Sequence, residues 1–224
     1  MNCKCKSHLC DLQLHLHKCN LQSHFAYTRL FFVSIMRLEQ AQELAAALQA
    51  SLRFGRAAVR LRLHLVGSAR RGEATNTDLD FIVVPKTRQT LRAREELLGT
   101  VTSALTSALA SALAVAPAIA RERALPAGGR RRSLDVIWGS ARVRVDLFFA
   151  QPDELPYALF HYTGSRLYNI RTRARAKARG WRLNQYGLFT ESGRRVRGSA
   201  QVRSERDIAA LLGVSYRAPE ERQK

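Results

Sequence analysis

The stretch that decides the fold runs from Gly67 to Val84 and reads G-S-A-R-R-G-E-A-T-N-T-D-L-D-F-I-V-V. Small polar residues at 67–77 and an apolar run at 79–84 predict a loop followed by a β-strand. Side chains two positions apart on a strand point to the same face, so we expect the carboxylates of Asp78 and Asp80 to lie side by side. Two such carboxylates repel each other unless cations lie between them.

A third acid, Asp146, lies in the run V-R-V-D-L-F-F at 143–149. This run predicts a second strand, and an unpaired carboxylate in an apolar strand is costly. If the two strands are neighbours, three carboxylates converge and can hold two Mg²⁺ ions about 3.5–4 Å apart. Each piece has a simpler interpretation alone, because D-x-D is common at strand ends and a buried Asp more often pairs with Arg. Together, Gly-Ser, D-x-D and a later strand Asp indicate a nucleotidyltransferase.

The rest of the chain predicts alternating helices and strands. The apolar spacing and the positions of Gly and Pro predict the following elements: a helix from Arg37 to near Gly55, a strand at 59–66, a helix at 88–115, a basic loop at 121–132, and strands at 134–138 and 142–149 joined by a Gly139-Ser140 turn. Pro152 and Pro156 mark a domain boundary. We therefore expect an α+β fold with three segments: an N-terminal extension at 1–36 and domains at 37–151 and 152–224.

The chain is strongly basic. Its 224 residues include 37 Lys and Arg against 18 Asp and Glu, for a net charge of +19, and only six of the basic residues are lysine. Guanidinium groups bind phosphate bidentately, so the composition favours a nucleic-acid partner, although codon bias toward Arg and Ala also contributes. The longest apolar run, Leu30 to Met36, is far shorter than the roughly 18 residues that cross a bilayer, and this excludes a membrane protein.

All four cysteines (Cys3, Cys5, Cys10 and Cys19) lie in the first 19 residues, and four of the six histidines lie in the first 36. Cys and His are zinc ligands, but the spacing lacks a paired C-x-x-C. We expect residues 1–36 to be a disordered extension, a stretch upstream of a true start at Met36, or a weak targeting peptide. A body without cysteine fits a reducing compartment.

Eight motifs make a family resemblance specific. They are G-S-A-R-R-G at 67–72, D-L-D at 78–80, R-V-D at 144–146, Y-T-G-S at 162–165, Asn169, Arg173, L-N-Q-Y-G-L-F at 183–189 and S-E-R-D-I at 204–208. In order and spacing they resemble DNA polymerase family X over about residues 37–219. The resemblance implies a polymerase beta-like nucleotidyltransferase palm with a mixed β-sheet and helices at 37–151, followed by a small α/β thumb at 152–224.

The resemblance also implies roles for individual residues. Asp78, Asp80 and Asp146 would be the catalytic metal ligands for two Mg²⁺ ions, with Mn²⁺ as a substitute, and Asp146 would take the primer 3′-hydroxyl proton. The nucleotide-binding residues would be Gly67, Ser68, Arg71, Arg37, His161, Tyr162, Gly164, Ser165 and Asn169, with a cis peptide between Gly164 and Ser165. The DNA-binding residues would be Arg173, Arg166, Arg171, Arg175, Lys177, Arg179 and Arg182.

Three departures from the family pattern stand out. His161 replaces a tyrosine beside the sugar, which affects ribose exclusion. Phe148 and Gln185 stand where the family has an arginine and a glutamate that interact as the thumb closes, and this implies altered closure. Only about 36 residues precede the palm, so we expect no lyase or fingers domain, as in the short viral members of the family.

These observations predict a monomeric, magnesium-dependent DNA polymerase that adds dNTPs to a primer in gapped DNA during base excision repair. We expect it to act in the nucleus or at a site of viral DNA replication and repair. The alternatives are a template-independent terminal transferase, an RNA nucleotidyltransferase, and a DNA-binding protein without activity. The intact acid triad argues against the last of these.

Overall fold

The structure is a computed structural model that describes residues 35–51, 61–112, 121–123, 129–138 and 141–222. Its centre is a five-stranded sheet in the order β2-β4-β7-β6-β5. The strands are β2 Leu61–Val66, β4 Asp78–Pro85, β5 Arg121–Arg123, β6 Arg131–Trp138 and β7 Ala141–Phe149. β4 and β7 run parallel and the other pairs are antiparallel. The expected α+β class with a mixed sheet is confirmed.

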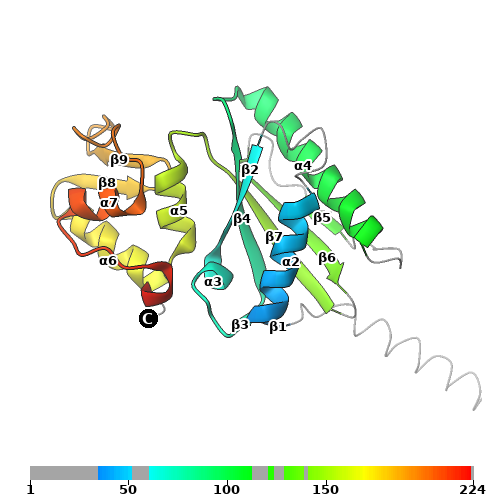
Figure 1. Cartoon of the computed structure of the whole chain (residues 1–224). Coiled ribbons are helices and arrows are strands. Elements are labelled where there is room, and N and C mark those ends of the chain that lie inside the picture. Colours follow the sequence, from blue (N-terminus) through cyan, green and yellow to red (C-terminus); the bar gives the residue numbers. More distant parts are fainter. Residues whose placement is uncertain (1–34, 52–60, 113–120, 124–128, 139–140, 223–224) are drawn as a thin grey trace, which may run out of the picture.

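The two faces of the sheet have different coverings. Helices α2 Leu38–Ser51 and α4 Leu91–Ala112 lie on one face (Figure 1), where their apolar side chains form a core with Leu79, Phe81 and Val83 of β4. On the other face, Ile82 and Val84 pack against α5 Leu155–Thr163. Because alternate residues share a face, Asp78 and Asp80 point to the α5 side of the sheet.

The C-terminal part of the chain has an apolar core of its own. It contains α5, α6 Arg166–Lys177, the hairpin of β8 Trp181–Asn184 and β9 Gly187–Thr190, α7 Glu205–Leu212 and the 3₁₀ helix η1 Pro219–Arg222. Phe160, Leu188 and Ile208 are fully buried there. We refer to residues 36–151 as the sheet unit and to residues 152–222 as the C-terminal unit. Figure 1 shows the C-terminal unit beside the sheet face opposite α2 and α4, with α5 at the junction.

Two expected loops contain regular structure. The loop at 67–77 includes the single-turn helix α3 Gly67–Arg70 and strand β3 Thr75–Asn76, which pairs with β1 Met36–Arg37. The expected basic loop at 121–132 includes β5 and the first two residues of β6, so that prediction was wrong at both ends. These strands form because distant segments pair with them, and the local pattern of the sequence carries no such signal.

Other expectations lie outside the described residues: the extension and the cysteines at 1–34, the helix end near Gly55, and the Gly139-Ser140 turn. Within the part of the chain that the structure describes, no helix combines the length and the apolar character needed to cross a membrane.

Candidate active site

The three acids come together where β4 and β7 lie side by side. In the parallel register Asp80 is opposite Asp146, and Asp78 is opposite Arg144. One carboxylate oxygen from each of Asp78, Asp80 and Asp146 lies within 4.8 Å of the other two. Hard divalent cations prefer such clusters of carboxylate oxygens, so the donor set fits a metal site.

The electrostatics of this cluster reflect both burial and crowding. Burial, followed by the charges of Asp78 and Asp146, raises the pKa of Asp80 from 3.8 to about 7. Burial and the charge of Asp146 also raise the pKa of Asp78. Nearby positive charge therefore stabilises the ionised form of this cluster.

Strand β6 supplies two partners of Asp146 that the sequence analysis missed. Arg131 donates from Nη2 to Asp146 Oδ2 at 2.6 Å, and the Ser133 hydroxyl donates to Asp146 Oδ1. Asp146 is 3% exposed and Ser133 is 8% exposed. Arg131 had been placed in the expected loop; once β6 is known to begin there, Arg131 and Ser133 share the face of Asp146.

The turn before the D-x-D pair requires glycine. Gly67 has φ +69°, in the left-handed region, and a Cβ atom at this position would lie 2.3 Å from Asp80 Oδ2. The next residue, Ser68, donates its hydroxyl to Asn76 Oδ1 at 2.6 Å, which fixes α3 against β3. The Gly67-Ser68 backbone is thereby held directly against the carboxylate cluster.

A cavity of about 520 Å³ lies over these groups and draws its walls from both units. The sheet unit contributes Gly67, Ser68, Arg71, Glu73, Thr75, Thr77, Asp78 and Asp80, and the C-terminal unit contributes His161, Tyr162, Gly164, Arg166 and Asn169. Three of these residues were not among the expected site residues: Glu73, Thr75 and Thr77. They lie in a polar loop sequence, which gives no indication that they line a cavity. Asp146 lies in the acid cluster that borders the cavity.

Two neighbouring arginines of the sheet unit reach across to the end of α5. Arg71 binds Glu73 through Nε at 2.9 Å and donates to the Thr163 carbonyl oxygen. Arg70 donates to the Thr163 hydroxyl and binds Glu205 at 2.7 Å. Both guanidinium groups therefore connect the two units, and Arg71 also lines the cavity.

On the opposite wall, His161 is held as a neutral ring. Arg173 Nη2 lies 2.8 Å from His161 Nδ1, and since arginine only donates, this nitrogen is the acceptor. Burial, followed by the charge of Arg173, lowers the pKa of His161 to about 4. Asn169 Nδ2 donates to the His161 carbonyl oxygen at 2.7 Å, which ties α6 to α5.

The junction between α5 and α6 has the cis peptide that the resemblance implied, between Gly164 and Ser165. Ser165 is the N-cap of α6 and accepts from the Tyr168 N–H at 3.4 Å. The cap starts α6 at Arg166, so that Asn169, one turn further on, lines the cavity.

Phe148, which stands where the resemblance implied an arginine, forms an aromatic pair with Tyr162. Phe148 of β7 and Tyr162 of α5 stack with ring centroids 4.0 Å apart and an interplanar angle of 19°. The Arg131 guanidinium lies over the Phe148 ring, with its Cζ atom 5.4 Å from the ring centroid. This stack is a direct apolar contact between the sheet unit and the C-terminal unit beside the acid cluster.

The remaining expected residues are more dispersed. Arg37 is exposed on β1 and pairs with Thr75, a cavity residue, through the β1–β3 ladder. On α6, Arg166 lines the cavity, whereas Arg171 lies elsewhere on the helix surface. Arg175 and Arg179 donate to the carbonyl oxygens of Leu212 and Leu211 at the end of α7, so both also stabilise the C-terminal unit. Lys177 and Arg182 are exposed.

Comparison with known proteins gives a consistent relationship. The family profile of the DNA polymerase beta thumb matches residues 158–223. "Repair DNA polymerase X" of African swine fever virus (isolate Pig/Kenya/KEN-50/1950) is 39% identical over 95 residues, 42% of this chain and 53% of the viral protein. "DNA polymerase/3'-5' exonuclease PolX" of Bacillus subtilis is 26% identical over 163 residues, 73% of this chain and 24% of the bacterial protein. The chain thus spans about half the length of the viral relative.

The fold has counterparts among solved structures. Leishmania infantum polymerase beta, in a ternary P/T complex, superposes with a TM-score of 0.67 at 21% identity, covering 85% of this chain and 77% of that one. The sheet with its acid cluster and the matched thumb define a polymerase beta-like nucleotidyltransferase fold. Within that class, the chain resembles the DNA polymerases of family X, including the viral repair polymerase.

Proposed function

We propose that this chain is a DNA-directed DNA polymerase that adds dNTPs to a primer 3′-hydroxyl in short gaps, as in base excision repair. The observation that carries the proposal is the acid cluster of Asp78, Asp80 and Asp146 beside a cavity whose far wall is the matched thumb. In this proposal residues 37–151 are the palm and residues 152–224 are the thumb. The protein acts as a monomer, in the nucleus or at a site of viral DNA replication.

The acid cluster suits two Mg²⁺ ions, with Mn²⁺ as a substitute. Three carboxylate oxygens lie within 4.8 Å of one another. The pKa of Asp80 is raised because burial and the neighbouring carboxylates destabilise its charged form, and a bound cation would remove this destabilisation. Divalent ions at such a site activate the attacking hydroxyl and stabilise the leaving oxygen.

The chain's own residues then position the substrates. Asp146, held by Ser133 and Arg131, accepts the proton of the primer 3′-hydroxyl at a carboxylate oxygen. Ser68 and Arg71, at the sheet-unit rim of the cavity, bind the triphosphate, and Arg37 approaches it from β1.

The C-terminal wall of the cavity would bind the rest of the nucleotide. His161 and Tyr162 contact the sugar, and Asn169 contacts the base. Gly164 lines the wall beneath the sugar, and Ser165, the N-cap of α6, follows it. Because His161 is neutral and already accepts from Arg173, it presents a ring edge rather than a charge to the sugar.

The DNA would follow the basic surface of the thumb. Residues 151–224 carry 15 Lys and Arg against 7 Asp and Glu, and α6 has no acid. Arg166 and Arg173 are nearest the nucleotide, and the other candidates on and after α6 bind backbone phosphates. Such contacts release counterions, so the affinity for DNA should fall steeply with rising salt.

The test is primer extension on DNA with a one-nucleotide gap, with Mg²⁺ and each dNTP in turn against each template base. We expect incorporation that follows the template base, requires the divalent ion and weakens with salt. Addition to single strands regardless of template would favour the terminal transferase, and preference for an RNA primer or NTPs would favour the RNA transferase. Salt-sensitive binding without incorporation on any substrate would leave only the inactive DNA-binding protein.

A further inference from the structure

One acid in the wall of the active-site cavity lies outside the carboxylate cluster. Asp78 and Asp80 line the cavity and belong to the cluster, whereas Glu73 lines it from the loop between α3 and β3. A further negative charge beside a triphosphate weakens binding, because like charges repel. Glu73 therefore opposes the ligand that the cavity is proposed to bind.

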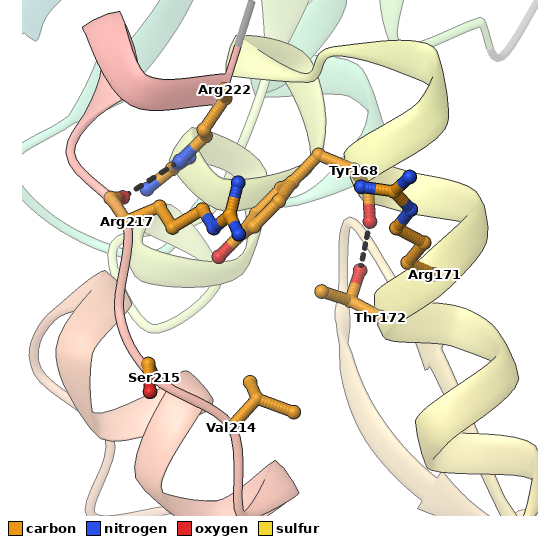
Figure 2. Close-up of a pocket in the computed structure, with 7 residues that line it drawn as sticks. All are labelled: Tyr168, Arg171, Thr172, Val214, Ser215, Arg217 and Arg222. Carbon is orange, nitrogen blue, oxygen red and sulfur yellow. Dashed lines mark hydrogen bonds between the residues drawn. The ribbon is translucent and has the colours of Figure 1, made fainter. Parts of the chain in front are cut away.

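A second cavity shows that arginines can line a wall without such an acid. It has a volume of about 380 Å³ and lies in the C-terminal unit, between α6 and the segment after α7 (Figure 2). Its lining residues include Arg171, Arg217 and Arg222, and none of the residues that line it is acidic. In the active-site cavity, by contrast, an acid lies directly against an arginine.

The arginine that Glu73 contacts is Arg71, to which the proposed function assigns the triphosphate. Arg71 donates from Nε, at 2.9 Å, and from Nη2 to the same oxygen, Glu73 Oε1. The Arg71 side chain is 12% exposed and the Glu73 side chain is 34% exposed, so the carboxylate is the more accessible partner. An anion that enters the cavity therefore meets this ion pair.

The backbone fixes Glu73 in this place. Its N–H donates to the Ser68 carbonyl oxygen at 3.1 Å, and its carbonyl oxygen accepts from Asn76 Nδ2 at 3.1 Å. The side chain of Asn76 also accepts from the Ser68 hydroxyl. Glu73 is thus held in the same loop as Ser68, the other residue proposed to bind the triphosphate.

Arg71 is held on its other side by the C-terminal unit. It donates from Nη1 to the Thr163 carbonyl oxygen, and a Cβ atom on Gly164 would lie 3.1 Å from the same nitrogen. These contacts keep the guanidinium at the wall of the cavity. Loss of the charge of Glu73 therefore changes what Arg71 binds more than where Arg71 lies.

We propose that Glu73 sets the affinity of this site for polyphosphates, because its carboxylate competes with the phosphates for Arg71. This inference rests on the proposed function, in which Arg71 binds the triphosphate. The competition weakens the binding of dNTP and of pyrophosphate alike, but dNTP keeps the contacts of its sugar and base, and pyrophosphate has neither. Glu73 thereby favours the departure of pyrophosphate after each transfer.

The test is titration calorimetry of the full chain with Mg²⁺ and no DNA, with inorganic pyrophosphate and dATP as separate probes. Glu73→Gln keeps an oxygen that accepts from Arg71 and removes the charge. We expect this variant to bind both probes about tenfold more tightly. Glu191→Gln, which removes the charge of an exposed glutamate after β9, should bind them as the unmodified chain does. Because the expected result is a gain of affinity, a poorly folded variant cannot imitate it.

Two further variants separate competition from its alternatives. Glu73→Ala should show a similar gain, because the Thr163 carbonyl oxygen still holds Arg71. In an Arg71→Gln background, Glu73→Gln should raise the affinity for pyrophosphate by less than about twofold. A tenfold gain in that background would indicate direct repulsion without competition and would overturn the inference. Unchanged or weaker binding by both single variants at Glu73 would also overturn it, since Glu73 would then only support Arg71.

Primer extension on gapped DNA gives a kinetic readout of the same competition. Glu73→Gln should reach its half-maximal rate at about tenfold less dNTP, and about tenfold less pyrophosphate should inhibit it. The binding experiment needs no DNA and no catalysis. A tenfold gain in binding without any primer extension would therefore refute the polymerase and leave the role of Glu73 intact.

Discussion

The buried His161 side chain makes the stability of the fold depend on pH. Burial and Arg173 lower the pKa of His161 from 6.5 to about 4, so the folded state binds fewer protons than the unfolded state between these values. The neutral ring's contribution to stability is therefore present above about pH 6.5 and is lost as the pH falls toward 4. The pKa of His64 is lowered in the same direction, so the whole chain has more than one such group.

We predict that His161→Gln weakens this pH dependence. Between about pH 7 and pH 5, the unmodified chain should lose more stability than the variant, by on the order of 1 kcal/mol, or about 2–4 °C in Tm. Thermal unfolding over this pH range measures the difference, and Arg194→Gln should behave as the unmodified chain. Parallel curves for the unmodified chain and the His161 variant would refute the assigned shift.

The residues of the acid cluster also show what the sequence could and could not predict. The pairing of Asp78 with Asp80 followed from strand periodicity, and the approach of Asp146 followed from assuming adjacent strands. The partners Arg131 and Ser133 could not be predicted, because a run of three arginines at 130–132 resembles a loop. Only the register between β6 and β7 brings these two side chains to Asp146.

Among the elements, α7 depends most visibly on its caps. The Ser204 hydroxyl accepts from the Asp207 N–H at 3.3 Å, and the Asp207 carboxylate accepts from the Ser204 N–H at 2.9 Å, which completes a capping box. At the other end Gly213 takes a left-handed conformation with φ 62°. With eight residues, α7 has little helical stability of its own and relies on these ends and on its buried face.

We predict that Ser204→Ala destabilises the protein by about 1 kcal/mol, or about 2–4 °C in Tm, because it removes the acceptor for a helix N–H group. Differential scanning calorimetry measures the loss, and Ser204→Asp should restore most of it. Ser192→Ala, which changes an exposed serine after β9, is the matched control. An unchanged Tm for Ser204→Ala would show that the cap contributes nothing.

Element boundaries were predictable where the signal was local. Alternating apolar residues placed β2, and a continuous apolar run placed β4. Apolar spacing placed α2, and a stretch rich in Ala and Leu before a proline placed α4. By contrast, β1 and β3 are two residues each and exist through pairing between segments almost forty residues apart. No local pattern in either segment favours a strand, so the sequence alone could not reveal them.

At the scale of the whole molecule, a few side chains hold the C-terminal unit against the sheet unit. Glu205 of α7 binds Arg70 of α3 at 2.7 Å and the fully buried Arg222 at 2.8 Å. The Phe148–Tyr162 stack and the Arg71 contact with Thr163 lie on the same side of the sheet. The relative position of the two units, and so the cavity between them, depends on these contacts.

We predict that Glu205→Gln lowers the free energy of unfolding by about 2 kcal/mol or more, because the buried Arg222 loses its counter-charge. The corresponding drop in Tm is about 4–8 °C. Glu191→Gln, at an exposed glutamate after β9, should leave the Tm unchanged. If both variants melted alike, Glu205 would not be the link between the two units.

The most direct test of the central claim compares Asp146→Asn with the unmodified chain in single-turnover primer extension and in binding of the same gapped DNA. Asparagine keeps the shape of the residue and removes its charge and its capacity to take a proton. We predict that extension falls by about a thousandfold or more while DNA binding is unchanged or tighter, and that Asp153→Asn, at an exposed acid, retains full activity. Extension by Asp146→Asn at a rate near that of the unmodified chain would contradict the account.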